Sequence, residues 1–94
     1  MRDRPARILL LIDTRLNWNQ RAGLSLLARD SQRSERHQEF AYDYYPSSSK
    51  AAGGALRITA HTGNPRQVVQ EVTQRMAEEL GVELQYRVAF NTAR

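Results

Sequence analysis

Two stretches of the chain combine an acid or a base with side chains that can hold an anion. Asp13 follows an apolar run and His61 follows an alternating one, so each lies where a strand is expected to end. If these strands are neighbours that run in the same direction, Asp13 and His61 meet at one sheet edge, where a proton can pass between them. Helices are expected to begin at the same edge, and helix N-termini attract anions. The residues expected to bind an anion or a nucleic-acid backbone there are Arg15, Asn17, His61, Thr62, Asn64 and Arg66.

The alternative interpretation of this edge is purely structural. Asn17 and Asn64 then only cap the helices that follow them, and Asp13 only bonds a loop backbone.

Motifs of known catalytic chemistry are missing from the chain. Gly53-Gly54 lacks the Lys-Ser/Thr pair of a phosphate-binding loop, and no serine lies in a Gly-x-Ser-x-Gly turn. With no cysteine and two histidines, neither a disulfide framework nor a multi-ligand zinc site is expected. We therefore expect no catalytic residue, no metal and no cofactor. A non-enzymatic function is favoured over an enzymatic one.

Composition limits the size and setting of the protein. The 94 residues are enough for one domain, which we expect to span 1–94. The apolar run Ile8–Ile12 is too short for a secretory or membrane-spanning segment, so no membrane partner and a cytoplasmic setting are expected. The net charge is +4, carried by thirteen arginines and one lysine. Arginine suits phosphate and carboxylate, although base composition of a genome also produces such a bias.

Hydrophobic periodicity predicts six elements. The expected strands are 7–13, 37–45, 56–61 and 82–90, and the expected helices are 18–31 and 65–80. Asn17 with Gln20, and Asn64 with Pro65, mark the two helix starts, and Gly81 marks an end. In the last strand Val82, Leu84, Tyr86, Val88 and Phe90 alternate with polar residues, which predicts one buried face. Residues 1–6 and 91–94 are expected to be flexible tails, and 46–54 a flexible loop.

The order of these elements predicts an α+β fold. A βαββαβ chain gives a ferredoxin-like arrangement, with sheet order 4-1-3-2 and two helices on one face. The first and third strands are expected to be central, adjacent and parallel.

Such a sheet leaves one face open. If Ile8, Leu10 and Ile12 point to the helices, Leu9 and Leu11 point away, and apolar residues on an open face are usually covered. The expected partner interface is Leu9, Leu11, Arg57, Arg87 and Tyr45. The central strands carry no aromatic residue, which argues against base stacking there, whereas phosphate-led binding needs only charge.

Three functions are compatible with these observations. The favoured hypothesis is a non-enzymatic binding or regulatory module that forms a homodimer through the open face and whose partner is a protein or a nucleic-acid backbone. The second is a small enzyme acting on an anionic substrate at the edge of Asp13 and His61. The third is an accessory subunit of a larger assembly.

Overall fold

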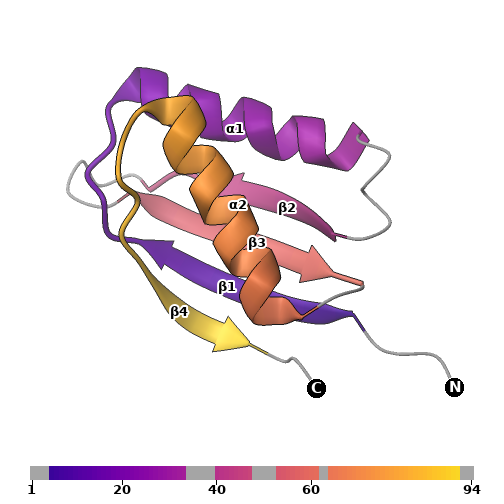
Figure 1. Ribbon diagram of the computed structural model, residues 1–94. Helices are drawn as coiled ribbons and strands as arrows, with labels where there is room; N and C mark the ends of the chain where they lie inside the picture. Colours follow the sequence, from indigo (N-terminus) through magenta and orange to yellow (C-terminus); the bar gives the residue numbers. More distant parts are fainter. Residues whose placement is uncertain (1–4, 34–39, 48–52, 62–63, 92–94) are drawn as a thin grey trace, which may run out of the picture.

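A computed structural model describes residues 5–33, 40–47, 53–61 and 64–91 of the chain. It has an α+β architecture, in which a four-stranded antiparallel open sheet carries two helices on one face (Figure 1). The elements in chain order are β1 (Ala6–Ile12), α1 (Trp18–Arg33), β2 (Phe40–Tyr45), β3 (Gly54–Ala60), α2 (Pro65–Leu80) and β4 (Tyr86–Asn91). The other face of the sheet carries no helix in the described part of the chain.

Strand directions differ from the sequence prediction. The sheet order is β2-β3-β1-β4, which has the same neighbours as 4-1-3-2 taken from the opposite edge. β1 and β3 are adjacent, but they are antiparallel, with Ala6 opposite Ala60 and Ile12 opposite Gly54. The expected parallel pair is therefore wrong. The reason is topological: the α1 crossover returns the chain parallel to β1, and β3 then pairs antiparallel to β2, which reverses the direction.

Both helices begin at the residues that the sequence indicated. At α1 the Gln20 amide donates to Asn17 Oδ1 at 2.8 Å, while the Asn17 amide donates to Gln20 Oε1 at 2.9 Å, which is a reciprocal capping box. At α2 the Asn64 side chain accepts from the Arg66 amide at 2.9 Å. Gly81 ends α2 in the left-handed conformation, at φ 68°.

The core lies between the sheet and the helices. Because residues opposite each other in an antiparallel ladder share a face, the register places alternate residues of each strand in rows across the sheet. One helix-facing row is Tyr42, Ile58 and Ile8, and the next is Tyr44, Leu56 and Leu10. All six are buried. From the helices, Leu24 and Met76 are fully buried against them.

The alternation predicted for the last strand is interrupted by a β-bulge. Leu9 pairs with Phe90 and the next residue, Leu10, pairs with Val88, so Ala89 is the extra residue. Phe90 consequently shares the open face with Leu9, whereas Val88 shares the helix face with Leu10. β4 begins at Tyr86 and not at residue 82, and Val88 and Phe90 are more than half exposed, at 53% and 55%. The single buried face predicted for this strand is therefore wrong.

Several predicted boundaries also shift. Ala6 belongs to β1 and is buried, α1 continues to Arg33, and Asn91 belongs to β4. Of the predicted loop 46–54, Gly54 is the first residue of β3, and Gly53 is buried, with its amide donating to the Ile12 carbonyl at 3.1 Å. Pro5, Pro46 and Ser47 are described and belong to no helix or strand. Residues 1–4, 48–52 and 92–94 of the predicted tails and loop lie outside the described residues, as do 37–39 of the second predicted strand.

Candidate functional site

The open face of the sheet brings together the residues expected at a partner interface. One row across it is Asp43, Arg57, Leu9 and Phe90, and the next is Tyr45, Ala55, Leu11 and Arg87. Leu9 and Leu11 are partly buried in the middle of the sheet, and Phe90 extends the apolar surface onto β4. We call Leu9, Leu11 and Phe90 the apolar stripe.

Two ion pairs flank the apolar stripe. Arg57 contacts Asp43 at 3.1 Å on the β2 side, and Arg87 contacts Asp13 at 3.1 Å on the β4 side. Both pairs are exposed, so each contributes little to stability. They matter more for the choice of binding partner, because a carboxylate of the same chain neutralises the positive charge of each arginine.

Tyr45 completes the β2 side of this face. The Arg57 guanidinium lies 5.4 Å from the centre of the Tyr45 ring, within the range of a cation–π contact. Tyr45 is 45% exposed. Tyr45 and Arg57 thus lie together on the β2 side of the apolar stripe.

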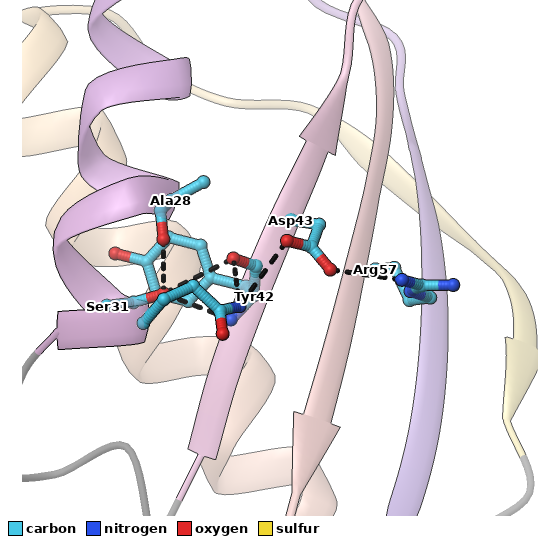
Figure 2. A network of polar contacts seen from close by, with 6 residues as sticks. Ala28, Ser31, Tyr42, Asp43 and Arg57 are labelled. Atoms are coloured by element: carbon cyan, nitrogen blue, oxygen red, sulfur yellow. Dashed lines mark hydrogen bonds and ion pairs between the residues drawn. The ribbon is translucent and has the colours of Figure 1, made fainter.

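A chain of polar contacts connects this side of the open face to α1 (Figure 2). The Ser31 hydroxyl donates to the Ala28 carbonyl at 2.7 Å and accepts from the Tyr42 amide at 3.1 Å. Gln32 Nε2 lies 3.2 Å from the Tyr42 carbonyl and 3.3 Å from Asp43 Oδ1, and Asp43 Oδ2 accepts from Arg57. These bonds occupy the outward backbone groups of Tyr42, so the side chains of α1 protect this point on the β2 edge.

The predicted anion edge is not assembled. Because β1 and β3 are antiparallel, Asp13 follows the end of β1 that lies beside Gly54, and His61 follows the end of β3 that lies beside Ala6. A seven-residue strand separates the two ends by roughly 20 Å. Asp13 and His61 therefore form no proton-transfer pair, and the two helix N-termini lie at opposite ends of the sheet.

Residues of the predicted anion site have separate surroundings. Asn17 and Asn64 are helix caps, as the structural alternative expected. Arg15 lies near Trp18 at the start of α1, where both line a surface hollow. Arg66 is in the first turn of α2, and Thr62 lies outside the described residues.

His61 lies at a different surface hollow, on the open face. Together with Arg57 and Phe90 it lines a shallow depression of about 460 Å³. The structure thus brings His61 near the expected partner interface and not near Asp13.

Asp13 has a structural role. Its carboxylate accepts from Arg87, and its amide donates to the Gln85 carbonyl at 2.7 Å. The neighbouring Thr14 hydroxyl accepts from the Gln85 amide at 2.6 Å and donates to the Glu83 carbonyl. These bonds fix the segment before β4 against the end of β1.

Sequence reasoning missed two residues that matter for this surface and for the fold. Phe90 reaches the open face only through the bulge, and strict alternation carries no signal of it. Arg21, within the helix-forming pattern of α1, is 5% exposed; its guanidinium donates to the Leu16 carbonyl at 3.2 Å and the Ser47 carbonyl at 2.9 Å. The only sequence signal for this role is that Arg21 lies one turn after the Asn17 cap, from where its side chain can reach back to the residue before the helix.

Among the described residues, the titratable groups with shifted pKa values are two core tyrosines. Burial raises the pKa of Tyr42 and of Tyr44 above their ordinary 10.0, with Arg75 and Arg21, respectively, opposing the shift. The Tyr44 hydroxyl donates to the Gly53 carbonyl. Among the described residues, no group of three or more His, Asp or Glu side chains is placed to hold a metal ion. Neither described helix is long and apolar enough to cross a bilayer.

Comparison of this chain with protein-family models, with curated proteins and with solved structures found no match.

Proposed function

We propose that this protein is a non-enzymatic binding module that forms a homodimer by stacking the open faces of two sheets. The observation that carries the proposal is the apolar stripe on a face that no described element covers. A two-fold axis through this face places the stripe of one copy against that of the other, which removes apolar surface from water. Within the same proposal, the element order and the sheet order support a ferredoxin-like arrangement.

The charges on this face favour a protein surface over a polyanion. Arg57 and Arg87 are each paired with a carboxylate, so neither offers a full positive charge to a phosphate. Paired charges around an apolar centre match the polar rim and apolar core of protein interfaces.

The size of the face predicts a weak dimer. Four strands about 4.8 Å apart and about 22 Å long have a flat area of roughly 400 Å². A standard interface buries about 800 Å² per partner, so this face lies at the low end. We expect a dissociation constant in the micromolar range.

The experiment is sedimentation velocity from 5 to 500 µM protein. The wild type is compared with the double variant Leu9→Gln/Phe90→Gln, which makes the stripe polar. The matched control is Leu26→Gln, because Leu26 is 57% exposed on α1, on the other side of the sheet. Far-UV circular dichroism confirms that each variant is folded. We expect dimers for wild type and control and monomers for the double variant; a wild type that is monomeric at 500 µM excludes the proposal.

Nucleic acid is a second candidate partner, and one observation favours it. Phe90 and Tyr45 place aromatic rings on the open face, and Phe90 lies beside His61 and Arg57. Rings and cations together are typical of surfaces that bind single strands. Fluorescence anisotropy with a labelled 20-nucleotide single strand at 0.05 and 0.3 M salt tests it. Binding that weakens steeply with salt and is lost on Phe90→Gln supports this candidate.

The structure bears differently on the two other functions hypothesised from the sequence. The enzyme at an Asp13–His61 edge loses its geometric basis, because these residues lie at opposite ends of the sheet. The accessory-subunit hypothesis stays a proposal. A wild type that is monomeric and binds no nucleic acid favours it over the dimer.

A further inference from the structure

A pocket separate from the open face lies on the helix side of the sheet. It has a volume of about 200 Å³ and is formed where α1, α2 and β2 meet. Leu27 from α1, Phe40 from β2 and Val72 from α2 provide its apolar walls. Because the sheet separates this pocket from the apolar stripe, a ligand here does not compete with the proposed dimer.

Tyr42 lines this pocket, and its hydroxyl has no hydrogen-bond partner among the described residues. The residue is 4% exposed, and its ring extends from β2 toward α1 (Figure 2). No described residue forms a hydrogen bond to the hydroxyl, although Ser31 holds the Tyr42 backbone. The described residues contain no fully enclosed side-chain oxygen or nitrogen without a partner, so the hydroxyl must border open space. A hydroxyl that borders open space in an otherwise buried residue is available to a ligand.

Opposite charges lie on the two helices at the rim of the pocket. Asp30 is on α1 and Arg75 is on α2, and both line the pocket. Neither has an ion-pair partner within 4.0 Å among the described residues, and they do not pair with each other. Glu71, one turn before Arg75, also lines the pocket but has a contact of its own. The pocket lining thus contains a carboxylate from α1, a guanidinium from α2 and the Tyr42 side chain from β2.

We propose that this pocket binds a small zwitterion of the free amino acid class, with an apolar side chain. The ligand ammonium contacts Asp30, and the ligand carboxylate contacts Arg75 and accepts from the Tyr42 hydroxyl. Arginine and a hydroxyl are both donors, which suits a carboxylate. The apolar walls receive the ligand side chain. The volume of about 200 Å³ limits the ligand to a small molecule.

Isothermal titration calorimetry tests the proposal, first with glycine, alanine, valine, leucine and methionine up to 20 mM. For L-leucine, the matched single-charge probes are isopentylamine, which lacks the carboxylate, and 4-methylpentanoate, which lacks the amine. We expect at least one amino acid to bind, and each matched probe to bind at least tenfold more weakly. Absence of binding by all five amino acids overturns the proposal, and so does an amine or carboxylate that binds as tightly as its zwitterion.

Variants then locate the site. Asp30→Asn, Arg75→Gln and Tyr42→Phe should each weaken binding at least fivefold. Arg29→Gln is the matched control, because Arg29 is exposed on α1 and does not line the pocket. Melting temperature without ligand is measured for each variant. Tyr42→Phe should fold normally, because no residue in the described part of the chain bonds to the Tyr42 hydroxyl. Equal binding by Arg75→Gln and Arg29→Gln would place the ligand elsewhere. The Leu9→Gln/Phe90→Gln variant should bind as the wild type does, so failure of the dimer and failure of this site are distinguishable.

Discussion

Replacing Ser31 with alanine should destabilise the protein, mainly because the Tyr42 amide loses its acceptor, while the bond that Ser31 donates to the Ala28 carbonyl is lost as well. Ser31 is 9% exposed, and its hydroxyl is the acceptor for the Tyr42 amide, which points outward from the β2 edge. Removing the oxygen leaves that buried amide without a partner, at a cost of about 1–3 kcal/mol. Alanine recovers about 0.5 kcal/mol through its higher helix propensity. The net loss is about 0.5–2.5 kcal/mol, equivalent to a thermal unfolding midpoint lowered by about 2–20 °C for a domain of this size.

The matched control for this prediction is Ser25→Ala in the same helix. Ser25 is exposed, so its replacement gives the propensity gain without losing a buried bond. Urea unfolding followed by circular dichroism at 222 nm measures both variants, since Trp18 is 74% exposed and is a poor fluorescence probe of the core. The difference between the variants isolates the contribution of the Ser31 hydroxyl. If the two free energies of unfolding agree within about 0.3 kcal/mol, Ser31 of α1 does not hold the β2 edge.

Three further changes test other parts of the fold. Gly54→Ala should cost at least 1 kcal/mol more than Gly81→Ala in urea unfolding: both glycines have positive φ, but a Cβ at Gly54 would lie 2.6 Å from a backbone oxygen, whereas Gly81 has open space around it. Arg21→Met should cost about 2–3 kcal/mol, because it leaves backbone carbonyls such as that of Ser47 without their donor; a loss below 0.5 kcal/mol in the same assay would show that water replaces the guanidinium. Burial raises the pKa of Tyr42 above 10.0, so the folded state holds its proton after the unfolded state has lost it, and stability should fall as pH rises above about 10. Tyr42→Phe should reduce that fall in thermal melts between pH 9 and 11, and an unchanged slope would contradict the assignment.

Local chemistry in the sequence was sufficient for the elements themselves. Both Asn caps and the left-handed Gly81 form as predicted, because capping depends on side chains within three residues of the helix end. Alternation in β1 and β3 correctly separated helix-facing residues from Leu9, Leu11 and Arg57, because the side-chain period of a strand is a property of its own backbone.

Tertiary structure decided everything that depends on how separate segments meet. The direction of β3 relative to β1 depends on the whole connection between them, through α1 and β2. The sequence patterns of the two strands alone led to a parallel prediction, whereas the strands are antiparallel. With that direction reversed, Asp13 and His61 separate to opposite ends of the sheet. The bulge at Ala89 is likewise a property of the β1–β4 ladder and not of β4 by itself, and it moves Phe90 to the open face. The sequence therefore determined which residues could form a surface, and the pairing of strands determined which of them share one.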